Sequence, residues 1–215
     1  MLRSIPMFMA LAGILVLGCK SEIDNKPAAK VEEAKGDTKG DAKGDAKPAA
    51  AAITYKVDAA ASSIGWVGAK VTGDHKGGFS AFSGEAALTD GKPTSISFVV
   101  DTTSVTSDDE KLTGHLKSPD FFDVEKFPKA SFTSSAIAEK AGDGGVTHEI
   151  SGELDLHGVK KAITFPAKLK VESTAASGEA EFTINRKDFG IVYAGMPDDL
   201  IKDEVLLKLS LRFAP

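Results

Sequence analysis

The sequence predicts an all-β domain, an antiparallel barrel or sandwich with one short helix. Three observations predict this class. Apolar and polar residues alternate along most of the chain after residue 52, residue pairs typical of tight turns separate the alternating segments, and no series of helices lies between them. Parallel α/β folds need such helices, so they are excluded. Neither Gly-x-Gly-x-x-Gly nor a Walker motif occurs.

The alternating segments predict about nine or ten strands, each with one face toward water. They lie at 55–57, 64–71, 79–88, 95–100, 132–138, 149–156, 163–171, 181–184 and 205–213. Residues that tolerate positive φ predict turns at Asp90-Gly91, Gly142 to Gly145, His157-Gly158 and Ser177-Gly178. Short connections of this kind join neighbouring antiparallel strands.

One segment departs from the alternation and predicts a helix over 108–117. Ser107 and Glu110 have the spacing of a capping box, in which each side chain binds the other residue's backbone amide. Two leucines one turn apart give the helix an apolar side. The adjacent Phe121 and Phe122 follow it, and they either plug one end of a barrel or belong to its core.

Residues 1–18 have the pattern of a lipoprotein signal peptide. Arg3 precedes an apolar run at 5–17, and the run ends at the chain's single cysteine, Cys19. The run is shorter than the ~20 residues of a membrane-spanning helix. Val-Leu-Gly-Cys resembles the bacterial lipobox, which predicts that Cys19 carries acyl chains of the palmitate type and becomes the mature N-terminus. The alternative is an ordinary secretory signal with an incidental cysteine.

Residues 19–52 predict a flexible linker behind this acylated cysteine. Lys-Gly-Asp occurs three times between Lys35 and Asp45, alanines follow, and aromatic residues are absent. A membrane-binding helix is the rival interpretation of the lysines, but the repeated glycines disfavour a helix and the acids cancel the charge. The folded domain is therefore expected at 53–215.

Three motifs occur in order within 53–215. They are the run from His115 to Asp123 with Phe127-Pro128 and Phe132 behind it, the run from Leu154 to Lys161, and Asp188-Phe189-Gly190. These motifs resemble the YceI family. The resemblance implies a lipocalin-like antiparallel barrel of the bacterial envelope, with the short helix near one end, that holds a polyisoprenoid or a similar long-chain amphiphile. The lipobox, the linker and the stretch 193–203 depart from many relatives.

The resemblance also implies a set of ligand-binding side chains. Trp66, Phe98, Phe165 and Phe182 would contact the apolar tail, Phe121 and Phe122 would lie near the mouth, and His115 would bind the backbone or a polar head group. The residues alone leave the interior open: small residues such as Gly68 and Ala180 favour a cavity, whereas the phenylalanines could fill it.

Composition excludes several other classes. The net charge of −5 offers no basic face for nucleic acid. One cysteine cannot form an intrachain disulfide or a multi-thiolate metal site. The four histidines, His75, His115, His148 and His157, lack the spacing of a zinc motif. We expect no metal and no cofactor besides a bound lipid.

We therefore expect a lipid-binding protein, not an enzyme, anchored through acyl chains to a bacterial envelope membrane. The outer membrane, with the domain in the periplasm, is the expected location. Two alternatives stay open. One is a hydrolase or isomerase that uses acids among Asp198, Asp199, Asp203 and Glu204, and the other is a barrel with a filled core. Some family members are dimers, so a homodimer is a further expectation.

Overall fold

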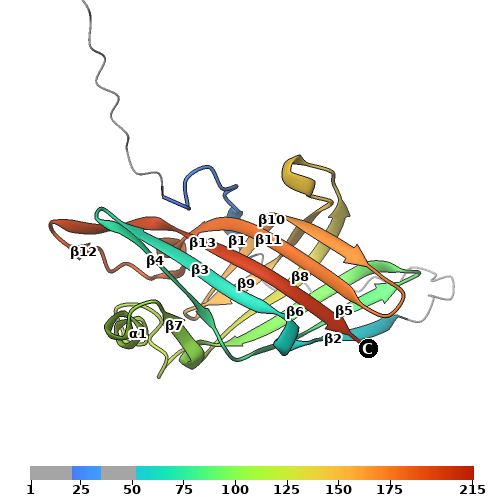
Figure 1. Cartoon of the computed structure of the whole chain (residues 1–215), viewed down its shortest axis with the longest axis horizontal. Coiled ribbons are helices and arrows are strands. Elements are labelled where there is room, and N and C mark those ends of the chain that lie inside the picture. Colours follow the sequence, from blue (N-terminus) through green and yellow to red (C-terminus); the bar gives the residue numbers. More distant parts are fainter. Residues whose placement is uncertain (1–20, 35–51) are drawn as a thin grey trace, which may run out of the picture.

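The computed structural model describes residues 21–34 and 52–215, and Figure 1 traces the chain. The expected signal peptide and Cys19 lie outside these ranges. The strands are β1 (Lys30–Glu33), β2 (Ile53–Val57), β3 (Ser63–Lys70), β4 (Gly73–Phe79), β5 (Phe82–Thr89), β6 (Lys92–Asp101), β7 (Val105–Ser107), β8 (Lys129–Glu139), β9 (His148–Leu156), β10 (Val159–Val171), β11 (Ala176–Asn185), β12 (Gly195–Met196) and β13 (Asp199–Ala214). The helix is α1 (Glu110–Leu116), and the short 3₁₀ turns are η1 (Ala59–Ala61), η2 (Thr102–Ser104), η3 (Asp143–Gly145) and η4 (Arg186–Phe189).

Eight strands close a barrel, which confirms the predicted fold class. Their order around the ring is β10, β9, β8, β6, β5, β2, β13 and β11, and β11 returns to β10. All of these pairings are antiparallel. The ring closes between β13 and β2 through the two pairs Phe213↔Val57 and Ala214↔Lys56. Closing the ring pairs most of the sheet edge, apart from a stretch of β10 that β11 does not reach.

A second group of strands extends this wall on one side. β3 pairs with β13 between Ile201 and Ser210, β4 pairs with β3, and β7 pairs with β4. The chain passes from β7 directly into α1, and Figure 1 shows the helix at the same end of the molecule as the β3–β4 and β12–β13 turns. This arrangement places the helix near one end of the barrel, as predicted. No helix within 21–34 and 52–215 has the length and apolar character that crossing a membrane requires.

The helix begins later than the capping box predicts. Asp109 is the N-cap, and its carboxylate accepts a hydrogen bond of 2.7 Å from the amide of Leu112. Ser107 cannot cap the helix because it is still paired with Gly77 at the end of β7. Its hydroxyl instead accepts from the amide of Asp109 at 3.0 Å, which shapes the turn into the helix.

Three of the four predicted turns are present. Asp90-Gly91 and His157-Gly158 adopt positive φ at both positions and join their strands directly, and Gly144 and Gly145 also have positive φ. The turn predicted at Ser177-Gly178 is wrong. Both residues lie within β11, opposite Arg212 and Leu211 of β13. Gly178 serves packing, because a Cβ atom there would lie 3.1 Å from the side chain of Leu169.

Residues 21–34 correct the linker prediction for their part of 19–52. β11 pairs with β10 only at 168–171, so the two strands diverge and leave the β10 edge open at 161–164. β1 occupies that edge, and the amides of Ala29 and Thr183 exchange hydrogen bonds with carbonyls across the gap to β11. A chain that fills a gap in a barrel wall satisfies backbone groups that would otherwise be exposed. We call residues 21–34 the N-terminal strap.

The strap also explains an irregularity in the strand pattern. Val67, Ala69 and Leu206 point to the outer face of the wall, where the alternation calls for polar residues, yet each is nearly inaccessible to solvent. Ile23 of the strap covers them and is itself 5% exposed. The strap therefore shields this outer apolar patch from water, and burial of the apolar surface stabilises the attachment of the strap to the wall.

Candidate ligand-binding cavity

A row of four phenylalanine rings crosses the barrel interior. The ring centroids are 5.3 Å apart for Phe98 and Phe132, 5.5 Å for Phe132 and Phe165, and 4.2 Å for Phe165 and Phe182. Each comes from an inward position of a different strand, β6, β8, β10 or β11. Gly152 makes room for the row, since a Cβ atom there would lie 2.5 Å from the ring of Phe132. The rings fill the middle of the barrel with hydrocarbon.

This row divides the interior into two unequal spaces. On the side toward α1 lies a cavity of about 340 Å³, and on the other side lies a void of about 30 Å³ bordered by Ala167, Gly178 and Ala180. Ligand pockets are typically about 300–1,000 Å³, so only the first space can hold a ligand. The expected cavity is therefore present on the α1 side of the row, whereas the alternative of a filled core describes the other side.

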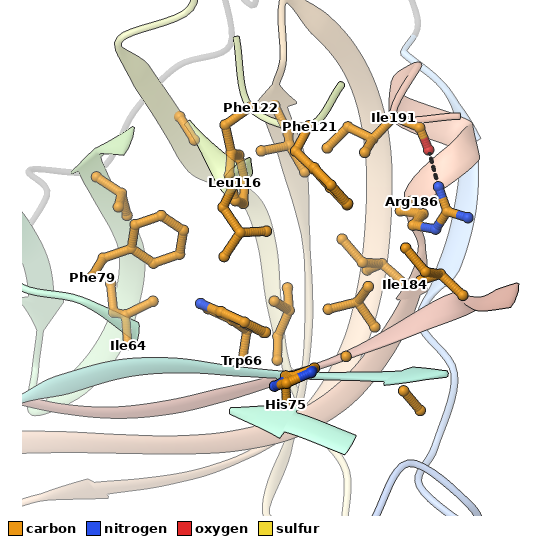
Figure 2. Close-up of a pocket in the computed structure, with 18 of the residues that line it drawn as sticks. Ile64, Trp66, His75, Phe79, Leu116, Phe121, Phe122, Ile184, Arg186 and Ile191 are labelled. Carbon is orange, nitrogen blue, oxygen red and sulfur yellow. Dashed lines mark hydrogen bonds between the residues drawn. The ribbon is translucent and has the colours of Figure 1, made fainter. Parts of the chain in front are cut away.

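The walls of the larger cavity are almost entirely hydrocarbon. Figure 2 shows aliphatic and aromatic side chains from opposite walls pointing into a common space, among them Ile64, Trp66 and Ile184. The indole of Trp66 lies next to Gly77, where a Cβ atom would approach the ring to 2.5 Å. Gly77 is therefore required for the indole to lie against the wall.

An aromatic group covers the cavity beside α1. Phe121 is 8% exposed and packs with Trp66, Leu116 and Ile191. Phe122 meets Phe79 edge to face with ring centroids 5.6 Å apart. The two phenylalanines thus close part of the barrel end and line the cavity at the same time, so the plug and core interpretations both apply.

The cavity opens between α1, the β3–β4 turn and the β12–β13 turn. Its lining residues at this end are partly exposed: the side chains of Lys70, His75 and His115 keep about a third of their surface, and Met196 is 62% exposed. The phenylalanine row closes the opposite end of the cavity. We call the open end, between α1 and the two turns, the mouth.

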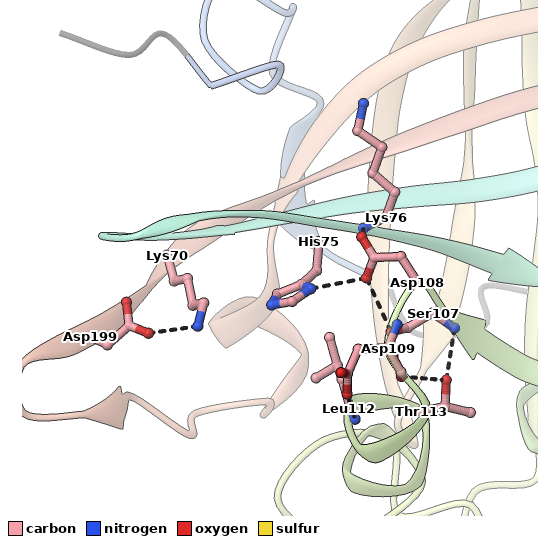
Figure 3. A network of polar contacts seen from close by, with 9 residues as sticks. All are labelled: Lys70, His75, Lys76, Ser107, Asp108, Asp109, Leu112, Thr113 and Asp199. Carbon is pink, nitrogen blue, oxygen red and sulfur yellow. Dashed lines mark hydrogen bonds and ion pairs between the residues drawn. The ribbon is translucent and has the colours of Figure 1, made fainter.

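One salt bridge and one histidine–carboxylate hydrogen bond hold the rim of the mouth together, as Figure 3 shows. Lys70 Nζ lies 2.7 Å from a carboxylate oxygen of Asp199, and His75 Nδ1 lies 2.9 Å from Oδ1 of Asp108. The hydrogen bond with Lys70 lowers the pKa of Asp199, and the hydrogen bond with His75 lowers that of Asp108. These pairs tie β3 to β13 and β4 to the start of α1.

Arg186 is a buried charge in the cavity wall that the sequence analysis missed. It is 4% exposed, and its guanidinium donates to the carbonyls of Lys202 (3.1 Å) and Ile191 (2.8 Å) and pairs with Asp203 at 3.3 Å. Burial lowers the pKa of Arg186, and the negative charge of Asp203 opposes that change. The side chain fastens the segment after η4 to β13. Two sequence signals mark the short turn η4 that carries Arg186. Asn185 caps its start, and Gly190 ends it in the left-handed conformation.

The structure brings the predicted binding residues together. Trp66, Phe98, His115, Phe121, Phe122, Phe165 and Phe182 all line the cavity. His115 Nε2 lies 2.8 Å from Asp120 Oδ2, a side-chain partner that the sequence did not suggest. The prediction omitted several wall residues, chiefly Ile64, Phe79, Phe132, Ile184 and Tyr193. Phe132 was part of a recognised motif, whereas the aliphatic residues carry no signal beyond the alternation.

The polar clusters considered as alternatives are dispersed. Asp199 pairs with Lys70, and Asp203 pairs with Arg186 and Lys187. Among residues 21–34 and 52–215, no three side chains of metal-binding type gather at one point.

The fold and the cavity define a class of protein: an antiparallel β-barrel with a hydrocarbon-lined interior space open at one end. The sequence model of the YceI-like domain matches residues 55–213, and the chain belongs to the YceI family. A UPF0312 protein of Pseudomonas putida (strain W619) is 36% identical over 123 residues, which cover 54% of this chain and 62% of that protein. The chain thus matches less than two thirds of this relative's length.

Two solved structures share the fold. BcnA of Burkholderia cenocepacia superposes with a TM-score of 0.63 at 25% identity, covering 73% of this chain and 98% of that one. A polyisoprenoid binding domain from Saccharophagus degradans, implicated in plant cell wall breakdown, has a TM-score of 0.59 at 19% identity, covering 75% and 98%. The second likeness concerns the fold alone.

Proposed function

We propose that this protein binds the apolar chain of a polyisoprenoid-like or other long-chain amphiphilic lipid in the bacterial cell envelope. The observation that carries the proposal is the cavity of about 340 Å³ between the phenylalanine row and the mouth, with its largely hydrocarbon walls and its polar rim. A lipid would lie with its chain inside and its polar end among Lys70, His75 and His115.

The energetics of burial suit such a ligand. Moving a methylene group from water into hydrocarbon contributes about 0.8 kcal/mol, so a five-carbon isoprene unit contributes about 4 kcal/mol before the cost of ordering the chain. A few units therefore suffice for micromolar affinity. The polyisoprenoid-binding neighbour supports this ligand class because its barrel has the same architecture.

Binding without catalysis is part of the proposal. The hydrogen bond with Lys70 lowers the pKa of Asp199, which makes that carboxylate a weak general base, and Asp203 is engaged by Arg186 and Lys187. We also propose that Cys19 carries acyl chains that anchor the chain to a membrane, with the outer membrane as its location and the barrel in the periplasm. Two or three acyl chains hold a protein stably on a bilayer, whereas one does not.

The chain supplies its own reporter for a binding test. Trp66 is the single tryptophan and lies in the cavity wall. A dansyl-labelled isoprenoid alcohol delivered in detergent should quench its fluorescence by energy transfer and saturate at one ligand per chain. Excess unlabelled isoprenoid alcohol should reverse the quenching. Quenching that neither saturates nor responds to the competitor would refute binding in the cavity.

A further inference from the structure

Apolar side chains are exposed beside the mouth. Val71 in the β3–β4 turn is 74% exposed, Met196 in β12 is 62% exposed and Leu200 in β13 is 50% exposed. The amide of Val71 donates to the carbonyl of Leu200 at 3.1 Å, and β12 pairs directly with the start of β13. These three residues therefore form one continuous feature, which we call the apolar tip.

The apolar tip presents hydrocarbon on both faces of the wall. Met196 lies on the cavity side, opposite Asp199, which also lines the cavity. Lys70 and Ile201 form a strand pair that lines the cavity, Val71 follows Lys70, and Leu200 precedes Ile201. Because side chains alternate between the two faces of a sheet, Val71 and Leu200 point to the outer face. A projecting edge with apolar groups on both faces suits insertion into a lipid layer better than contact with one flat protein surface. Asp198, exposed in the same turn, restricts insertion to the interfacial layer.

The N-terminal strap fixes the start of the described chain beside this tip. The Ser21 hydroxyl donates to both carboxylate oxygens of Asp74, at 2.9 and 2.8 Å, and the amide of Glu22 donates to the same group at 3.2 Å. Asp74 follows the β3–β4 turn, three residues after Val71. Glu22 also pairs with Lys76 at 2.6 Å. The strap is thus held on the outer surface of the same hairpin that carries Val71.

The sequence places the expected acylation site two residues before this point. Two residues span at most about 7 Å, so an anchor at Cys19 would hold Ser21 within about that distance of the lipid surface. A linker of some thirty residues would let the barrel drift from its anchor, but the strap leaves no such length between Cys19 and the apolar tip.

We propose that the apolar tip docks into the lipid surface that holds Cys19, so that the mouth of the cavity opens against the bilayer. This inference rests on the proposed anchor and on the proposed lipid binding. Because Met196 and Asp199 belong to both the tip region and the cavity lining, a lipid chain could pass from the bilayer into the cavity without entering bulk water. The partner is a phospholipid surface, not a second protein.

A depth measurement tests the docking. Acylation consumes the thiol of Cys19, so Met196→Cys provides one reactive thiol for a bimane label in the full acylated chain. The control is Ile53→Cys, because Ile53 is 58% exposed in β2, at the end of the molecule away from β12 (Figure 1). On phosphatidylethanolamine and phosphatidylglycerol vesicles containing doxyl lipid, the label at 196 should be quenched at least threefold more than the label at 53. Equal quenching, or none at 196, would overturn the proposal.

A transfer measurement separates docking from ligand binding. Val71→Asp with Leu200→Asp changes only exposed side chains outside the cavity lining. Uptake of a dansyl-labelled lipid from vesicles, followed by energy transfer from Trp66, should slow at least tenfold in this variant. Saturation with the same lipid supplied in detergent should be unchanged. The control variant Val71→Ile with Leu200→Met keeps both side chains apolar and should take up lipid from vesicles at the wild-type rate.

The outcomes distinguish the proposals. If the wild-type chain takes up no lipid even from detergent, the binding function fails. If the chain does not associate with vesicles, the anchor fails and the docking fails with it. If wild type and the aspartate variant take up lipid from vesicles at the same rate, lipid binding stands and the docking is wrong. A loss of transfer that appears in cells but not on pure vesicles would assign the apolar tip to a protein partner, and would equally overturn the proposal.

Discussion

Phe165 and Phe182 stack with their ring centroids 4.2 Å apart and their planes at 14°, across the junction of β10 and β11. Phe182 is 1% exposed and closes the phenylalanine row that forms the floor of the cavity. The stacked pair therefore contributes to stability and also sets how far a ligand can enter the barrel.

Truncation of this pair should destabilise the barrel. Phe182→Ala leaves a void next to Phe165 and should lower the free energy of unfolding by about 3–5 kcal/mol, as phenylalanine truncations in cores do. Urea denaturation followed by circular dichroism measures the change. Phe182→Leu keeps most of the volume and should cost less than the alanine variant; equal losses would show that the floor is not tightly packed.

Filling the cavity should weaken ligand binding without disturbing the wall. Gly68 lines the cavity, and a Cβ atom there meets only the Trp66 ring, at 3.6 Å. Gly68→Leu should therefore raise the Kd for a dansyl isoprenoid at least tenfold. The matched control is Gly114→Ala on the exposed side of α1, where nothing lies within 4 Å. It should leave Kd unchanged and raise stability by about 0.5–1 kcal/mol. Unchanged affinity in Gly68→Leu would place the ligand elsewhere.

The N-terminal strap should loosen in acid. Hydrogen bonds from Lys208 and Lys76 lower the pKa of Glu22 from 4.5 to about 2. A lowered carboxyl pKa contributes stability that is fully present above pH 4.5 and is lost as the pH falls toward 2. Hydrogen exchange at residues 21–34 should therefore be faster in Glu22→Gln than in wild type at pH 7, and the difference should shrink as the pH approaches 2. A difference that does not change with pH would argue against the ion pairs as its cause.

Arg186 should not be replaceable by lysine. Arg186→Lys loses the fork that reaches two backbone carbonyls and Asp203, and a lysine cannot satisfy all three. Unfolding should become easier by about 1–3 kcal/mol for the buried groups left unpaired. Lys187→Gln removes the exposed partner of the same aspartate and should cost about 0–1 kcal/mol. Chemical denaturation of both variants compares them directly, and equal effects would contradict the role of burial.

Much of the barrel could be predicted because the strand signal is local. Ile150 and Leu154 are buried in β9 as their alternation predicts, and His157-Gly158 forms the expected turn. The helix start was misplaced by two residues because Ser107 has a ladder partner, Gly77, that lies far away in sequence. Capping rules consider only the helix and the residues next to it in the sequence, so they do not include the pairing of Ser107 with a distant strand.

The strap could not be predicted from its own composition. Residues 21–34 are rich in charged residues, like the repeats that follow them. They take a defined position because they fill a gap between β10 and β11, and that gap exists only in the closed barrel. The signal lay elsewhere, in Val67 and Leu206, which are apolar at positions of the outward phase. Similarly, the residues of the binding set could be named from their motifs and phase, whereas the division of the interior by four rings depends on packing across strands.

The most direct test of the account is the lipid content of the protein itself. The full chain should be purified from bacterial membranes, extracted with organic solvent and analysed by mass spectrometry, beside Gly68→Leu prepared in the same way. We predict about one long-chain lipid per wild-type barrel and at least a tenfold loss in the variant. Equal amounts in the two preparations, or a wild-type barrel that yields no lipid and takes up none when it is supplied, would contradict the claim that this cavity holds a lipid chain.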